Sequence, residues 1–122
     1  MAKTIMIVDD SASLRQVVAI ALRSSGYDVI EGVDGVDALA KLKGQKVHLI
    51  ISDVNMPNMD GLTFVTELKK KPEYKFTPVI MLTTEAGEDK KAAGQAAGAK
   101  AWIIKPFKPE QMITAVSKLI LP

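Results

Sequence analysis

Five residues carry the side chains best suited to chemistry, and each stands within two residues of the end of a short apolar run: Asp9, Asp10, Asp53, Thr83 and Lys105. Clustered carboxylates raise one another's pKa unless a cation lies among them. Hard oxygen ligands without histidine or cysteine beside them suit Mg²⁺. A carboxylate can also accept a phosphoryl group, whose charge the metal offsets. The set therefore indicates phosphoryl chemistry on an aspartate, with a lysine counter-charge and a threonine hydroxyl donor.

Each of these residues alone has an ordinary explanation. An aspartate after a strand is often a turn or helix-capping residue, and Asp10 could cap the helix that follows. Lys105 alone would be a solvated loop lysine. The functional interpretation depends on all of them meeting at one edge of the fold.

Composition sets broad limits on the protein. The chain has 122 residues, 48% hydrophobic and 25% charged, which predicts one globular domain over residues 1–122. The absence of cysteine excludes disulfides and thiolate metal sites, and suits the cytoplasm. A net charge of +2 gives no indication of nucleic-acid binding. The N-terminal apolar stretch is too short for a signal peptide or a membrane span.

Five short apolar runs predict strands. They are Ile5–Val8, Val29–Ile30, Val47–Ile51, Val79–Leu82 and Ala101–Ile104. The runs are continuous rather than alternating, which is typical of parallel strands that are covered on both faces. Val29–Ile30 is the weakest run and suits the edge of a sheet.

Helix-period segments separate the runs. Their apolar faces are predicted at Leu14, Val17, Val18, Ala21 and Leu22; Val36, Leu39 and Leu42; Leu62, Val65 and Leu68; the alanines of residues 88–97; and Met112, Ile113, Val116, Leu119 and Ile120. Ser11 or Ser13 is the expected cap of the first helix, and Pro109 begins the last.

Five alternating strand–helix units predict an α/β fold: a doubly wound, five-stranded parallel sheet with helices on both faces. We expect the flavodoxin-like strand order 2-1-3-4-5. Ligands bind such sheets beyond the carboxyl ends of the strands, at the switch point between strands one and three. The five polar residues are therefore expected to converge there.

Four motifs stand together at these strand ends. They are Asp9-Asp10, Asp53-Val54-Asn55-Met56-Pro57-Asn58-Met59-Asp60-Gly61, Thr83-Thr84-Glu85 and Lys105-Pro106-Phe107. In this combination the chain resembles response-regulator receiver domains over essentially its whole length, and single-domain chemotaxis receivers of the CheY type in particular. The expected strand order is borrowed from such receivers, which are a known example of it.

The resemblance implies a role for each motif residue. Asp53 would be the phosphoacceptor, and a phosphohistidine on a sensor histidine kinase would be the donor. Mg²⁺ would be held by Asp10, Asp53 and the backbone carbonyl of Asn55, with Asp9 acting through water. Thr83 and Lys105 would contact the phosphoryl oxygens, and the Lys105–Pro106 peptide would be cis.

The resemblance also implies a switch rather than an enzyme. Asn55 and Glu85 would lie beside the path of the hydrolytic water and tune self-dephosphorylation. Trp102 stands where chemotaxis receivers carry a switching tyrosine, so it would be either a switch aromatic that follows Thr83 or half-buried packing. Because the chain stops at Pro122, we expect output through a phosphorylation-dependent partner of a monomer. That partner would be the flagellar motor switch protein or another protein, and a phosphatase could also act on the receiver.

The sequence is also compatible with other functions. A stand-alone receiver could serve twitching motility, a phosphorelay or a phosphate sink. An aspartate-nucleophile phosphatase would carry a second aspartate where Asn55 stands, and a flavin carrier would need a Ser/Thr/Gly-rich loop in place of Asp9-Asp10. His48, Met56 and Met59 are interpreted as structural, with His48 inside the third strand.

Overall fold

The computed structural model describes residues 3–83, 96, 98–105 and 107–120. Its strands form one parallel sheet in the order β2-β1-β3-β4-β5. They are β1 (Thr4–Val8), β2 (Asp28–Gly32), β3 (Leu49–Asp53), β4 (Val79–Thr83) and β5 (Ala101–Ile104). The predicted fold class and strand order are confirmed.

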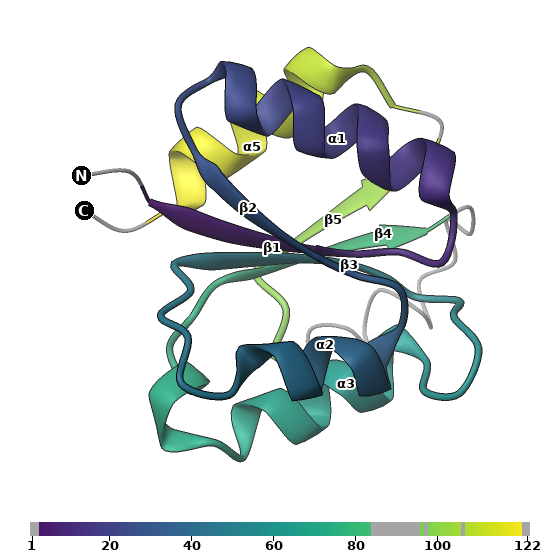
Figure 1. Cartoon of the computed structure of the whole chain (residues 1–122), viewed down its shortest axis with the longest axis vertical. Coiled ribbons are helices and arrows are strands. Elements are labelled where there is room, and N and C mark those ends of the chain that lie inside the picture. The colour runs from purple at the N-terminus through teal and green to yellow at the C-terminus, as the bar shows by residue number, and fades with distance from the viewer. Residues whose placement is uncertain (1–2, 84–95, 97, 106, 121–122) are drawn as a thin grey trace.

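Helices cover both faces of the sheet (Figure 1). On one face lie α1 (Ala12–Ser24) and α5 (Pro109–Leu119), and on the other lie α2 (Gly35–Leu42) and α3 (Gly61–Lys69). A short 3₁₀ helix, η1 (Pro72–Tyr74), follows α3. Of the helix predicted at 88–97, only residue 96 is among the described residues. No helix in the described ranges is long and apolar enough to cross a membrane.

The sheet separates two apolar clusters. Residues alternate between the faces of a strand, so Met6 and Val8 join the cluster under α2 and α3, whereas Ile5 and Ile7 join the cluster under α1 and α5. Burial on both sides explains why the runs of β1, β3 and β4 are continuous.

Side-chain oxygens cap three of the helices. The Ser11 hydroxyl accepts a hydrogen bond from the Leu14 N–H at 3.4 Å, so Ser11 is the cap of α1 and Asp10 is not. Asp34 and Asp60 cap α2 and α3 in the same way, at 2.8 and 2.7 Å from the amides that they accept. Each cap satisfies a backbone donor that the first turn leaves free.

Three residues predicted on buried helix faces are exposed: Val17, Val36 and Ala96. Val17 and Val36 each keep 51% of their surface accessible. The buried face of α1 is formed by Val18, Ala19 and Leu22, and at 3.6 residues per turn Val17 points away from it. In α2, the small residues Gly35 and Ala38 contribute to the buried face, so the phase of the helix differs from that predicted.

The predicted start of the third strand was wrong by two residues. β3 begins at Leu49, so Val47 and His48 precede it. His48 Nδ1 accepts a hydrogen bond from the Thr4 N–H at 3.0 Å, and the His48 N–H donates to the Thr4 carbonyl at 2.8 Å. His48 thus extends the contacts between β1 and β3 to the residue just before β3 begins, in agreement with a structural role.

β2 forms one edge of the sheet, as its short apolar run predicts. Glu31 in this strand bonds Arg15 Nε at 3.1 Å and Arg23 Nη2 at 3.5 Å through its carboxylate. Its backbone carbonyl accepts a hydrogen bond from Lys41 Nζ at 2.7 Å. Three cations from the helices on both sides therefore gather at this edge.

Replacing Tyr74 by Phe is expected to lower the free energy of unfolding by about 1–2 kcal/mol, because the Leu42 and Gln45 carbonyls lose their contacts with the hydroxyl. The Tyr74 hydroxyl lies 2.5 Å from the Leu42 carbonyl and 2.7 Å from the Gln45 carbonyl, which joins η1 to the end of α2. Urea denaturation measures the loss. A variant as stable as the parent would contradict the importance of these bonds.

Candidate functional site

The sheet register brings the predicted site residues to one edge. Asp53 ends β3 opposite Leu82, Thr83 ends β4 opposite Ile104, and Asp9 directly follows β1. The backbone N–H of Lys105 donates to the Thr83 carbonyl at 2.7 Å, so the β4–β5 ladder continues one residue past β5. The convergence follows from the parallel strands ending together.

Three carboxylates form the centre of the site. Among the residues that the structure describes, Asp9, Asp10 and Asp53 can each place one oxygen within 4.8 Å of the others. Asp9 is completely buried and Asp53 nearly so, whereas Asp10 is exposed. The cluster therefore opens to solvent at Asp10, with Asp9 and Asp53 forming its floor.

Lys105 joins the two buried carboxylates. Its Nζ lies 3.1 Å from Asp9 Oδ2 and 3.4 Å from Asp53 Oδ1. Three carboxylates against one ammonium leave two negative charges uncompensated in a largely buried site. Oxygen ligands and this deficit of positive charge fit a divalent cation such as Mg²⁺.

Asp9 is held by contacts on several of its atoms. Besides Lys105, its Oδ1 accepts the Ser11 N–H at 2.8 Å, and its backbone carbonyl accepts Arg15 Nη1 at 2.7 Å. Sequence reasoning missed Arg15. The signal available was its place one turn into the helix that follows Asp9, and that place does not identify its partner.

Burial raises the pKa of the Asp53 carboxyl above its ordinary value, and the neighbouring charge of Asp9 raises it further. The Lys105 ammonium lowers the pKa without reversing the rise, and Asp10 makes a smaller contribution to the rise. A carboxylate crowded in this way is relatively basic, which suits a nucleophile.

Asp53→Asn is expected to make the metal-free protein more stable at pH 7. Because folding raises the pKa of Asp53, its stabilising contribution is fully present only below the unfolded-state pKa and is lost as the pH rises through the folded-state pKa. The gain from Asn should therefore shrink as the pH falls. Urea midpoints in a chelator, measured across the pH range, test this; equal midpoints at pH 7 would contradict it.

Thr83 and Trp102 share one face of the sheet. Trp102 lies opposite Met81 in the register, and both belong to the cluster under α2 and α3, whereas Leu82 and Ile103 belong to the other cluster. By alternation, the fully buried Thr83 lies on the same face as Met81. Trp102 is partly buried there, beside the strand that carries Thr83.

Asn55 lies in the loop between β3 and α3, with its side chain exposed. The base of this loop is closed by the Gly61 N–H, which donates to the Val54 carbonyl at 2.8 Å. The predicted tuning residue Glu85 and the predicted cis partner Pro106 lie outside the described residues.

Residues 5–117 match the response regulator receiver domain. The chain belongs to this family. Receiver domains are phosphoacceptor switches of two-component systems rather than classical enzymes, and their acidic cluster is where Mg²⁺ binds. The recognition made from the four sequence motifs is confirmed.

This receiver is similar to several characterised proteins. It is 37% identical over 112 residues to Protein PilG of Pseudomonas aeruginosa, covering 92% of this chain and 83% of that protein. The chemotaxis protein CheY4 of Vibrio cholerae superposes with a TM-score of 0.95 at 43% identity, covering 98% of this chain and all of that one.

A second similar structure contains a metal. The receiver domain of the sensor histidine kinase PA1611 from Pseudomonas aeruginosa has a TM-score of 0.89 and 26% identity, with 98% of each chain covered. A magnesium ion is coordinated in its active-site cleft.

Proposed function

We propose that this receiver, spanning residues 1–122, accepts a phosphoryl group on Asp53 from a histidine kinase, with Mg²⁺ in the site. The observation that supports this most is the Lys105 ammonium between two buried carboxylates, with a third carboxylate within 4.8 Å. A carboxylate oxygen of Asp53 would bond to phosphorus as the phosphorus–nitrogen bond of phosphohistidine breaks. The imidazole leaves with the bonding pair and takes up a proton.

The surrounding residues would bind the metal, contact the phosphoryl group and control its hydrolysis. Asp10, Asp53 and the backbone carbonyl of Asn55 would hold Mg²⁺, with Asp9 acting through water; the bound ion would offset charge on the phosphoryl oxygens. Lys105 would exchange carboxylate contacts for phosphoryl contacts, and Thr83 would donate its hydroxyl. The side chains of Asn55 and Glu85 would set the rate at which water removes the phosphoryl group.

Treatment with a small acyl-phosphate donor and Mg²⁺ tests the assignment. Intact mass should rise by one phosphoryl group that hydroxylamine removes, because hydroxylamine cleaves acyl phosphates. Asp53→Asn should abolish the gain. Modification of the Asp53→Asn variant at the parental rate, or an unmodified parent, would overturn the proposal.

Trp102 is proposed as the residue that reports the phosphorylated state to the adjoining surface. Its position on the face shared with Thr83 supports this, because a shift of Thr83 toward the phosphoryl group would leave space beside the indole. The chain has one tryptophan, so its fluorescence should change with Mg²⁺ and the phosphodonor. An emission spectrum that stays the same through phosphorylation would exclude the switch role.

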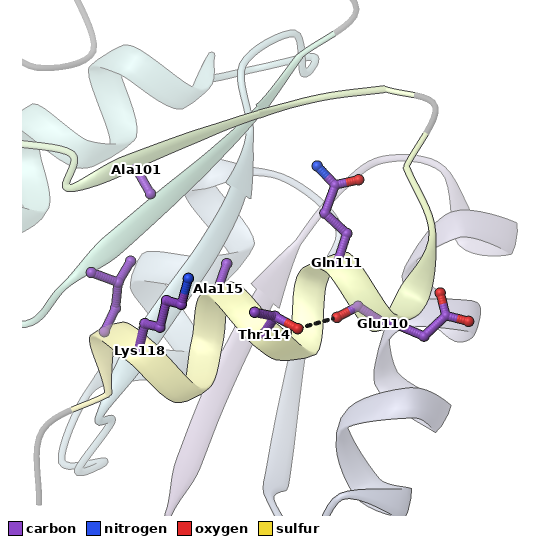
Figure 2. A pocket seen from close by; sticks show the side chains of 7 residues that line it. Ala101, Glu110, Gln111, Thr114, Ala115 and Lys118 are labelled. Carbon is purple, nitrogen blue, oxygen red and sulfur yellow. Dashed lines mark hydrogen bonds between the residues drawn. The ribbon is translucent and has the colours of Figure 1, made fainter.

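We propose chemotaxis as the pathway, with the flagellar motor switch protein as partner, since CheY4 of Vibrio cholerae is a chemotaxis protein at 43% identity. The described part of the face around β5 and α5 carries a largely apolar cavity of about 490 Å³ (Figure 2). Ala101 of β5 lines it together with Ala115 and Leu119 of α5. Two charged residues of α5, Glu110 and Lys118, line it as well. A partner side chain could enter this cavity.

A pull-down with and without beryllofluoride, an acyl-phosphate mimic, tests the partner. Retention of the motor switch protein should require the mimic. Absence of retention in both states would remove the motor assignment and favour another pathway, such as twitching motility, a phosphorelay or a phosphate sink.

A further inference from the structure

The loop of residues 54–60, which follows Asp53, is fastened to the start of α2. Asn58 Nδ2 donates to Asp34 Oδ2 at 2.8 Å. Beside this bond the Met59 side chain packs so closely on Gly35 that a Cβ at Gly35 would lie 2.8 Å from Met59 Cγ. This loop and the start of α2 lie at the end of the sheet where α1 begins (Figure 1).

The acceptor of this bond is itself held in place. The other oxygen of Asp34 accepts the Asp37 N–H at 2.8 Å, and only 7% of the residue is exposed. These hydrogen bonds, the one from the Asp37 backbone first and that from Asn58 second, lower the pKa of Asp34. The carboxylate is therefore charged at neutral pH, and hydrogen bonds to a charged acceptor are the stronger kind.

The donor has an unusual backbone conformation. Asn58 has a φ of 66°, which makes it the one non-glycine residue in the left-handed region within the described ranges. Asparagine tolerates this region better than other side chains. The turn directs the amide away from the loop and toward α2, as the 2.8 Å bond to Asp34 requires.

Neither helix depends on this bond for its start. Asp60 caps α3 by accepting the Thr63 N–H at 2.7 Å, and Asp34 caps α2 through its other oxygen. The base of the loop is closed separately by the Gly61–Val54 hydrogen bond at 2.8 Å. The Asn58–Asp34 bond therefore restrains the loop itself, which contains Asn55.

We propose that Asp34 and Asn58 are positioning residues that hold loop 54–60 in the conformation needed for metal binding and phosphoryl transfer. The inference rests on the proposed function, because it assigns a role to the loop of that site. Neither residue touches the phosphoryl group; they act through the backbone between Asn55 and Asn58. A loop restrained in advance binds its ligand without the entropy cost of ordering.

Two variants separate this role from ordinary structural support. Asn58→Gly keeps the left-handed backbone and loses the amide, whereas Asp34→Ser keeps a helix cap and is too short to reach Asn58. Each should raise the Mg²⁺ dissociation constant about threefold to tenfold, because only part of the strength of one charge-assisted hydrogen bond acts on the conformation of the loop. The double variant should lose no more than either single variant, because both remove the same bond.

Calorimetric Mg²⁺ titration, phosphorylation rate and urea midpoint are measured on all forms of the full chain. Asp34→Asn serves as the rescue variant. Its amide oxygen still caps α2, and its NH₂ group donates to the Asn58 amide oxygen once the Asn58 amide turns over, so its Mg²⁺ affinity should stay within about twofold of the parent. The inference would be overturned if the losses of Mg²⁺ affinity were additive in the double variant, or if both single variants bound Mg²⁺ as tightly as the parent. It would also be overturned if each loss of Mg²⁺ affinity were matched by a proportional fall in the urea midpoint, because a general loss of stability would then explain it. A parent that neither binds Mg²⁺ nor is phosphorylated would instead overturn the proposed function, and the inference with it.

Discussion

Lys105→Met is expected to destabilise the metal-free protein by about 3 kcal/mol at neutral pH, because it leaves two buried carboxylates without their cation. Lys105 Nζ lies 3.1 Å from Asp9 and 3.4 Å from Asp53, and these carboxylates are 0% and 8% exposed. Methionine retains the length and packing of the lysine stem, so the loss reports the charge. Urea denaturation in a chelator measures it.

Because unpaired carboxylates cause this loss of stability, added cations or protons should reduce it. Adding Mg²⁺ should restore part of the stability of Lys105→Met, because a cation again lies among the carboxylates. Lowering the pH should also narrow the gap to the parent as the acids become protonated. The double variant Lys105→Met/Asp53→Asn should regain stability relative to Lys105→Met, since one unpaired charge is removed.

Lys70→Met is the matched control. Lys70 pairs with Glu67 at 3.1 Å on the surface, where the side chains are 67% and 42% exposed. Exposed pairs of this kind contribute about 0.5 kcal/mol or less. Equal losses at Lys70 and Lys105 would show that the ammonium between Asp9 and Asp53 has no special role in the fold.

Gly61→Ala is the second large effect, with an expected loss of at least about 3 kcal/mol. A Cβ at Gly61 would lie 2.0 Å from the Asp53 carbonyl oxygen and 2.9 Å from Met81 Cε. The oxygen belongs to the backbone of β3 and has little freedom to move aside. The first turn of α3 would have to shift away from the strand end, and the loop that contains Asn55 would shift with it.

Thermal or urea unfolding measures this effect, and Mg²⁺ affinity should fall with it. Gly26→Ala is the control, because a Cβ there meets nothing within 4 Å and only the φ of 95° is unfavourable. Its cost should be about 1–2 kcal/mol. A smaller loss at Gly61 than at Gly26 would contradict the contact with Asp53.

The positions of residues that follow apolar runs were predictable, because they depend only on identifying each run as a strand. An apolar run covered on both faces indicates a parallel strand, and whatever follows it lies at the carboxyl edge. Asp9, Asp53 and Lys105 were therefore assigned to one site from their positions alone. In the structure, Lys105 Nζ lies within 3.4 Å of a carboxylate oxygen of Asp9 and of one of Asp53. The identity of the metal ligands came from the family resemblance instead.

Other features depend on information that local sequence does not carry. Apolar spacing predicts a helix, but the small residues Ala19 and Ala38 fit either face, so Val17 and Val36 were assigned to the wrong side. The Asn58–Asp34 bond joins residues 24 positions apart, and their types predict only a turn and a cap. Such contacts follow from the packed loops, which single-sequence patterns do not describe.

Glu31 has a consequence for how the molecule behaves among copies of itself. An edge strand offers unpaired backbone groups to any other strand, and a charged residue in the edge opposes such pairing. Glu31 and its three cations place a desolvation cost on any chain that would extend the sheet beyond β2. The edge therefore opposes extension of the sheet from one copy of the receiver into the next, which protects the protein against aggregation through β2.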